Sequence, residues 1–126
     1  MTFKIGIITD NVLFSDLFIP LLNKKLDPTE FYVCSTLIDL DKKIKELACD
    51  LILVDGDINN ISSFEIIHFI RTSQQQKAPI WFFTTIKTEA YIHKSLVVGA
   101  SKIIYKPFDP NMIVDDIVKL LINKHS

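Results

Sequence analysis

The sequence predicts an α/β domain in which a doubly wound parallel sheet is covered by helices on both faces. Two observations support this prediction: short apolar runs alternate with longer amphipathic runs along the chain, and the apolar runs are continuous. Continuous apolar strands are typical of parallel sheets that are buried on both faces. Strands that alternate with helices favour right-handed crossovers. The 126 residues suit one domain, which we expect to span residues 1–126.

Each expected element is bounded by residues that commonly start or stop it. The strands are expected over Phe3–Ile8, Phe31–Leu37, Leu51–Val54, Ile80–Phe83 and Lys102–Tyr105. The helices are expected over Val12–Leu26, Leu40–Ala48, Ser62–Arg71, Thr88–Val98 and from Pro110 onward. Gly99 is expected to stop the fourth helix, and Asp109 to cap the last. The elements therefore alternate from one end of the chain to the other.

Helical spacing predicts which faces of the first and last helices are buried. In the first helix, we expect the stripe Leu13, Leu17, Leu21 and Leu22 to face the sheet. Pro20 lies inside this helix and removes one backbone hydrogen bond, so we expect a kink or a late start. The inward face of the last helix is expected to hold Met112, Ile113, Ile117, Leu120 and Leu121.

The composition excludes several classes of protein. Lys and Arg (14) nearly balance Asp and Glu (15), so the chain offers no general attraction to nucleic acid or to an anionic membrane. Cys34 and Cys49 lack metal-ligand spacing and are expected to be buried thiols in a reducing compartment. The N-terminal apolar run meets Asp10 too early for a signal peptide or a membrane span. We therefore expect a cytoplasmic domain without a zinc site.

Polar residues follow four of the expected strands, at the point where each strand ends. They are Thr9-Asp10-Asn11, Asp55-Gly56-Asp57, Thr84-Thr85 and Lys106-Pro107. The carboxyl ends of parallel strands share one edge of a sheet, and ligands of such sheets bind there. Clustered carboxylates need a compensating cation, and oxygen ligands suit Mg²⁺. Carboxylates beside a lysine therefore predict metal-assisted phosphoryl chemistry.

These strand ends also give the chain a specific resemblance to a known family. Asp10, Asp55, Thr84 and the stretch from Gly99-Ala100-Ser101 to Lys106-Pro107-Phe108 resemble the motif of response-regulator receiver domains, the chemotaxis-regulator fold of two-component signalling. The resemblance covers nearly the whole chain. It implies a flavodoxin-like (βα)5 fold with strand order 2-1-3-4-5 and a cis peptide bond before Pro107. It also implies a signalling domain that promotes its own phosphotransfer and dephosphorylation, rather than an enzyme.

The resemblance assigns the acidic residues their roles. It implies that Asp55 is the phosphoacceptor, the residue to which a phosphoryl group is transferred. It also implies that Mg²⁺ is the cofactor and that its ligands are Asp10, Asp55 and the backbone carbonyl of Asp57. A metal held there would neutralise negative charge that develops during phosphoryl transfer.

Four further residues are implied to contact the phosphoryl group. The Thr84 hydroxyl would bond it, and the Lys106 ammonium would pair with it. The backbone N–H groups of Gly56 and Thr85 are expected to donate to its oxygens, as the amides of phosphate-binding loops do.

Several positions depart from the usual family pattern. Thr9 stands where the family usually has a second acid, so we expect weaker Mg²⁺ binding. Asp57 either partly replaces that acid or repels an incoming phosphodonor. Asn59 and Ser63 stand where proline and glycine are usual, so the loop after the third strand lacks its common turn residues.

Three functions remain open at this point. In the first, a histidine kinase or phosphotransfer protein phosphorylates Asp55, and the fourth helix, fifth strand and last helix then bind an effector, an output domain or a second copy of the chain. In the second, the chain is a degenerate receiver that binds a protein partner without phosphorylation. In the third, Asp55 and Asp57 are the nucleophile and acid/base pair of a haloacid-dehalogenase-like phosphatase. None of the three needs direct nucleic-acid or membrane binding.

Overall fold

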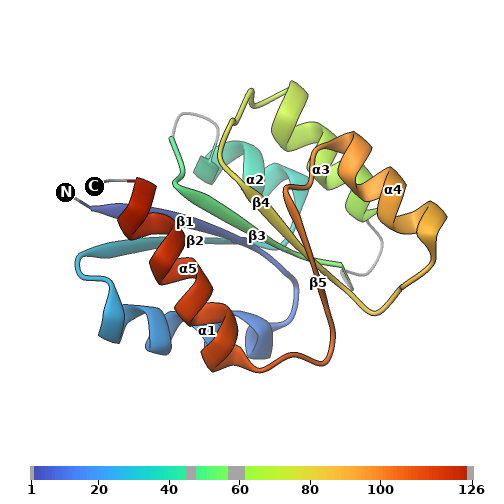
Figure 1. Cartoon of the computed structure of the whole chain (residues 1–126). Helices are drawn as coiled ribbons and strands as arrows, with labels where there is room; N and C mark the ends of the chain where they lie inside the picture. The colour runs from blue at the N-terminus through green and yellow to red at the C-terminus, as the bar shows by residue number, and fades with distance from the viewer. Residues whose placement is uncertain (1, 45–47, 57–61, 125–126) are drawn as a thin grey trace.

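The strands form one parallel sheet in the order that the resemblance implies. The computed structural model describes residues 2–44, 48–56 and 62–124. The strands are β1 (Phe3–Ile8), β2 (Thr29–Cys34), β3 (Leu51–Asp55), β4 (Ile80–Thr84) and β5 (Lys102–Tyr105). They pair in parallel in the order β2-β1-β3-β4-β5. The predicted doubly wound α/β fold is therefore confirmed (Figure 1).

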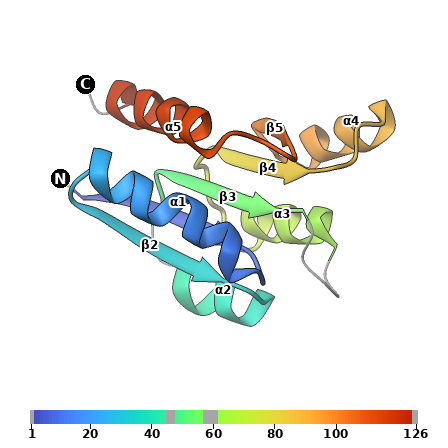
Figure 2. The same cartoon turned by 90° about the horizontal axis from the view of Figure 1, so that it is seen from below.

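Helices cover both faces of this sheet. They are α1 (Val12–Lys25), α2 (Leu37–Ile44), α3 (Ser63–Thr72), α4 (Glu89–Val98) and α5 (Pro110–Lys124). Helices α1 and α5 lie together on one face, and α2, α3 and α4 lie on the other (Figures 1 and 2). Within the described residues, no helix combines the length and the apolar character that crossing a bilayer requires.

The sheet separates two apolar cores. Phe82 and Phe83 are neighbours in β4 and are both fully buried, but they belong to different cores because side chains alternate along a strand. Phe83 lies on the side of α1 and α5, where its ring is 5.1 Å from that of Phe14 and 5.1 Å from that of Phe108. The ring of Phe108 also stacks on Phe18, at 5.7 Å. Because Phe108 belongs to the turn that follows β5, this turn is anchored on the aromatic cluster.

The buried face of α1 agrees with the predicted stripe only in the second half of the helix. Phe14, Phe18 and Leu22 are buried, whereas Leu13 and Leu17 are 68% and 42% exposed. Leu22 is buried as predicted and Leu21 packs partly buried against the core, but the prediction was wrong for Leu13 and Leu17. The larger phenylalanine rings bury more apolar surface and fill the space above the sheet in their place. The outward leucines leave an apolar surface on the exposed side of α1.

Three smaller predictions also need correction. Of the two effects expected from Pro20, a kink or a late start, the late start is wrong, because α1 begins at Val12. Strand β2 ends at Cys34, earlier than predicted, because the chain enters α2 at Leu37. In α5, Met112 is 66% exposed instead of facing inward, although the other predicted core positions of that helix are buried or partly buried.

Arg71 joins the end of α3 to the turn between α4 and β5, a role that the sequence did not indicate. Its guanidinium donates to the backbone oxygens of Gln76 and Ala78 at 2.9 and 2.7 Å, and to Gly99 O at 3.1 and 2.8 Å. Gly99 has φ 129°, a backbone conformation that residues other than glycine rarely adopt. A Cβ at this position would also lie 2.6 Å from the Arg71 side chain. Gly99 thus ends α4 as predicted and also makes room for the arginine.

Candidate functional site

The Asp55 carboxylate lies at the centre of the site. Asp55 is the last residue of β3, and its side chain is 3% exposed. Its Oδ1 atom forms an ion pair with the Lys106 ammonium. Its Oδ2 atom accepts a hydrogen bond of 2.7 Å from the Thr9 hydroxyl. Both oxygens of this buried carboxylate therefore have a donor, and these bonds offset the cost of removing the carboxylate from water.

The turn after β5 places Lys106 beside Asp55. The Lys106 backbone N–H donates to Thr84 O at 3.0 Å, which ties this turn to the end of β4. The Lys106–Pro107 peptide bond is cis, as the resemblance implied. The ammonium also lies 5.5 Å from the centre of the Phe14 ring. Residues that are 51 positions apart in the chain thus meet at the carboxyl edge of the sheet, an edge marked by the parallel arrowheads in Figure 2.

The hydrogen bond from Thr9 to Asp55 was not predicted from the sequence. Thr9 follows β1, the neighbour of β3, and it is 3% exposed. The resemblance drew attention to the acid that is absent at this position, whereas the structure shows a hydroxyl that bonds the Asp55 carboxylate. A signal was available in the sequence, since position 9 follows the strand that pairs with β3 and threonine is a hydrogen-bond donor.

The two other threonines lie at the end of β4, next to Asp55. Thr84 is buried, and its hydroxyl oxygen accepts from Ile86 N at 3.1 Å. This bond leaves the hydroxyl proton of Thr84 to be donated to another acceptor. Thr85 is exposed. Because β4 pairs with β3 so that Phe83 lies opposite Asp55, both threonines lie just beyond the carboxylate along the sheet edge.

Gly56 serves the site differently from what the sequence analysis expected. Its backbone N–H donates to Phe83 O at 2.7 Å, so this conformation does not offer that N–H to a phosphoryl oxygen. A Cβ at position 56 would lie 2.4 Å from the same Phe83 oxygen. Glycine is therefore required here for the close approach of β3 to β4. Ser63, which stands where glycine is usual in the family, donates to Gly56 O at 3.1 Å and holds this turn from the other side.

The acidic residues at this edge form a sparse set of possible metal ligands. Asp10 is exposed and follows Thr9 at the end of β1, while Asp57 lies outside the described residues. Across residues 2–44, 48–56 and 62–124, no three or more Asp, Glu, His or Cys side chains gather into a group that could hold a metal ion. Mg²⁺, however, commonly uses one or two carboxylates and keeps several waters. Asp10 and Asp55, at the ends of adjacent strands, supply two carboxylates of the kind that Mg²⁺ uses.

A pocket of about 270 Å³ opens beside the carboxylate. Its polar lining includes Asp55 and Lys106, the two members of the ion pair. The rest of its wall is mostly apolar, and it is formed by Asn11, Leu13, Phe14, Leu17, Pro107 and Phe108. The outward leucines of α1 thus border the entrance to the ion pair. The pocket is large enough to admit a phosphoryl group to the carboxylate.

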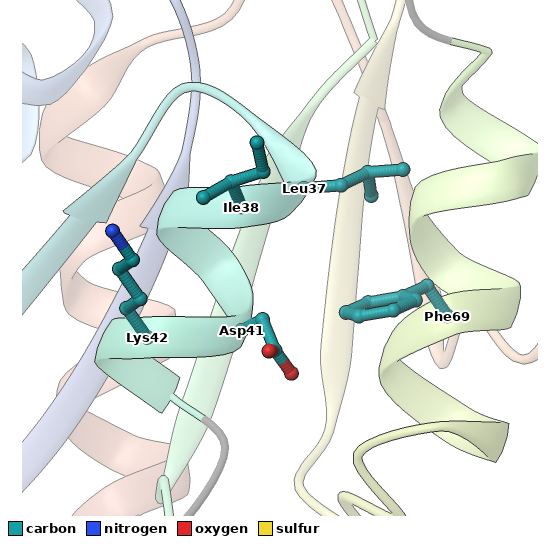
Figure 3. Close-up of a pocket in the computed structure, with 5 residues that line it drawn as sticks. All are labelled: Leu37, Ile38, Asp41, Lys42 and Phe69. Carbon is teal, nitrogen blue, oxygen red and sulfur yellow. The ribbon is translucent and has the colours of Figure 1, made fainter.

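A second hollow, of about 310 Å³, lies between α2 and α3 on the other face of the sheet. Figure 3 shows Phe69 of α3 pointing toward α2, with Leu37 and Asp41 on the facing side of that helix. Ile38 and Lys42 complete its lining. None of the strand-end residues predicted to carry chemistry lines this hollow. It is therefore separate from the site at Asp55.

The fold and the site together define a class of protein: a doubly wound α/β domain with an aspartate–lysine pair at the carboxyl edge of its sheet. The family model described as the response regulator receiver domain matches residues 5–118. The chain therefore belongs to the response regulator receiver domain family, a family of signalling domains. A comparison with curated protein sequences finds no match.

Solved structures with the same fold are numerous. A two-component response regulator from Clostridium difficile matches with a TM-score of 0.84 and 19% identity, over 98% of this chain and 99% of that one. The signal receiver domain of a DNA-binding response regulator from Colwellia psychrerythraea matches with a TM-score of 0.82 and 20% identity, over 95% and 98%. Response regulator DrrB from Thermotoga maritima matches at 0.77 and 18%, over 98% of this chain and 54% of that one. At these identities, the likeness concerns the fold.

Proposed function

We propose that the chain is a phosphorylatable switch in which Asp55 accepts a phosphoryl group from a histidine kinase or a phosphotransfer protein. The observation that carries this proposal is the buried Asp55 carboxylate, which pairs with Lys106 beside an open pocket. A carboxylate is a suitable nucleophile for forming an acyl phosphate. The Lys106 ammonium, which pairs with Asp55 Oδ1, stabilises the negative charge of the incoming phosphoryl group. Membership of the receiver family supports the same reading.

The transfer itself needs few groups. An Asp55 oxygen attacks phosphorus, an O–P bond forms, and the P–N bond of a phosphohistidine donor breaks with its electron pair leaving on the imidazole. Mg²⁺, held by Asp10, Asp55 and the backbone carbonyl of Asp57, would supply neutralisation of phosphoryl charge. The Lys106 ammonium pairs with the Asp55 carboxylate before transfer and with the phosphoryl oxygens after it. The Thr84 hydroxyl and the Thr85 N–H lie at the next strand end and are the proposed donors to those oxygens.

The readout of the switch is proposed to be the surface of α4, β5 and α5. The Lys106 backbone bonds Thr84, so a movement of either residue toward a phosphoryl group would move the other. The same surface carries exposed apolar side chains: Leu96 and Val97 are 47% and 69% exposed, and Tyr105 is 37% exposed. An effector, an output domain or a second copy of the chain would bind there. A local charge change that biases a packed surface is the usual logic of such switches.

We further propose that residues 1–126 form one receiver domain and that it works in the cytoplasm. The continuous sheet and the two cores that share it support one domain. The two cysteines are buried and free, as expected of a protein in a reducing compartment. Phosphodonor proteins of two-component systems would meet the chain in that compartment.

The direct test is uptake of phosphate from a small donor. Incubation with acetyl phosphate and Mg²⁺, followed by intact mass spectrometry, is expected to add one phosphoryl group to the wild type. Asp55→Asn is expected to abolish the added mass, because the amide is not a nucleophile for this transfer. The matched control is Asp115→Asn, which removes an exposed aspartate of α5 and should leave uptake unchanged. Uptake by Asp55→Asn, or none by the wild type, would contradict the proposal.

One observation favours a second candidate function. Thr9 replaces an acid and bonds Asp55, so the site has fewer metal ligands than the family usually provides. A degenerate receiver would bind its partner through the same surface without phosphorylation. The mass experiment separates the two, since the degenerate receiver gains no phosphate even at high Mg²⁺. The phosphatase alternative has no comparable support, because the family match is to receiver domains.

A further inference from the structure

Thr9 and Asp55 are held next to each other by the sheet itself. Strands β1 and β3 pair in parallel up to Ile8 and Val54, and each of the two residues directly follows its strand's last paired position. Thr9 is 3% exposed and Asp55 is 2% exposed. The hydrogen bond between their side chains is therefore shielded from water, and its geometry is set by backbone pairing rather than by a flexible loop.

The direction of the Thr9 hydroxyl is also determined. Its oxygen accepts from Asn11 N at 3.0 Å, which leaves its single proton to be donated elsewhere. Two acceptors lie within reach: Asp55 Oδ2 at 2.7 Å and Asn11 O at 3.4 Å. The carboxylate oxygen is both nearer and charged, so it is the stronger acceptor. The β-branched side chain of threonine has few χ1 rotamers, which helps keep this arrangement fixed.

The two carboxylate oxygens consequently have different surroundings. Oδ1 pairs with Lys106, and both residues line the pocket. Oδ2 is bound by Thr9, which is buried and does not belong to the pocket wall. We propose that Thr9 is a positioning residue for phosphoryl transfer: by holding Oδ2, its hydroxyl fixes the carboxylate so that Oδ1 faces the pocket and acts as the nucleophile. This inference rests on the proposed phosphoacceptor function.

The hydrogen bond from Thr9 to Asp55 Oδ2 is retained throughout the proposed phosphoryl transfer. With acetyl phosphate as donor, a lone pair of Oδ1 forms the new O–P bond, the P–O bond to the acetyl group breaks, and the electron pair leaves with acetate. Oδ2 becomes the carbonyl oxygen of the acyl phosphate and still accepts from Thr9. Holding a nucleophile in line with the atom that it attacks lowers the activation barrier by a large amount. A merely structural Thr9 would affect stability without affecting the rate of uptake in the folded protein.

The test compares Thr9→Val, which removes the hydroxyl at constant shape, with Thr9→Ser, which keeps it. The rate of phosphate uptake from acetyl phosphate is measured at a temperature at which both variants are folded. We expect Thr9→Val to slow uptake about tenfold and Thr9→Ser to restore most of the wild-type rate. Thr72→Val, an exposed threonine at the end of α3, is the matched control. If Thr9→Val does not fold, Thr9→Ser against Thr9→Ala gives the same contrast.

A second readout does not depend on phosphorylation. In protein labelled with ¹³C at aspartate carboxyl groups, the Asp55 signal, assigned with Asp55→Asn, is expected to shift in Thr9→Val and to return in Thr9→Ser. Wild-type uptake together with an unchanged rate in Thr9→Val would overturn the role of Thr9 while leaving Asp55 as phosphoacceptor. An unchanged carboxyl signal would likewise overturn it. No uptake by the wild type would overturn the proposed function, and the positioning role with it.

Discussion

Two lysine–aspartate pairs in this molecule show how much the surroundings of an ion pair determine what it does. Lys106 and Asp55 meet at the carboxyl edge of the sheet, where their side chains are 19% and 3% exposed. Lys25 of α1 and Asp115 of α5 meet on the surface, where theirs are 46% and 53% exposed. The same chemical groups are in contact in both places. Only the first pair has a buried carboxylate and lies beside a pocket.

Burial, and not contact alone, distinguishes the candidate site. A surface pair gains little because water screens its charges and both side chains lose freedom. A buried carboxylate depends on its partners, because the cost of removing it from water must be offset by the ammonium and by hydrogen bonds such as that of Thr9. Removing one partner should therefore have very different consequences in the two pairs.

The largest expected effect is that of removing the buried cation. Lys106→Met keeps most of the apolar stem but leaves the Asp55 carboxylate without its ammonium. We expect the free energy of unfolding to fall by about 2 kcal/mol, less than for a fully enclosed pair because the pocket admits water. Urea unfolding of the wild type and of the variant at pH 7 measures this loss.

The double variant sharpens this prediction. In Lys106→Met with Asp55→Asn both charges are gone, so most of the lost stability is expected to return. The four proteins form a double-mutant cycle whose interaction energy isolates the pair. Strictly additive effects would show that Lys106 and Asp55 do not stabilise each other, and the buried pair would then resemble the surface pair.

The convergence of this site was largely predictable from the sequence. Continuous apolar strands alternating with helices predict a parallel sheet, and a parallel sheet brings its carboxyl ends to one edge. This reasoning is enough to expect Asp55 and Lys106 near each other, although it says nothing of which oxygen faces which partner. The contact of Thr9 depends on the pairing of β1 with β3, which the strand order implies, and on a hydroxyl rotamer, which residue patterns do not encode.

The errors have a common physical origin in three-dimensional packing. Leu13 and Phe14 are adjacent apolar residues in α1, and spacing alone does not say which of them faces the sheet. Phe14 packs on Phe83 of β4, and both Phe83 and its neighbour Phe108 lie far along the chain from α1. The sequence also did not reveal that the backbone N–H of Gly56 is engaged. It donates to Phe83 O because β3 and β4 are paired, so it is not available to a phosphate in this conformation. Local patterns do not contain this information.

We expect an intermediate effect at a buried thiol whose pKa is set mainly by burial. Cys34 is fully buried at the end of β2, and burial raises the pKa of its thiol to about 12 from an ordinary value of 9.0. Between these values the unfolded chain has lost the thiol proton and the folded chain has kept it. Stability therefore falls as pH rises from about 9 toward 12, since the folded state binds more protons.

The measurement is urea unfolding at pH 8 and at pH 10.5 for the wild type and Cys34→Ala. The variant removes the thiol, so its stability should fall less between the two pH values, whatever constant cost its small cavity adds. Titration of the remaining groups is common to both proteins and cancels in the difference. Equal losses in the two proteins would show that the Cys34 thiol is no harder to ionise in the folded state than in the unfolded one.

The smallest effect is expected at the surface pair. The hydrogen bond and charge of Lys25 lower the pKa of Asp115, but both side chains are open to water and salt. We expect Lys25→Ala and Asp115→Asn to leave the thermal midpoint unchanged within error at physiological ionic strength, because the screened attraction is balanced by the side-chain freedom that the pair gives up. Differential scanning calorimetry at low and at physiological salt provides the check. A loss comparable to that of Lys106→Met would mean that contact alone sets the strength of a lysine–aspartate pair in this fold, and burial could then no longer be used to single out the pair at Asp55.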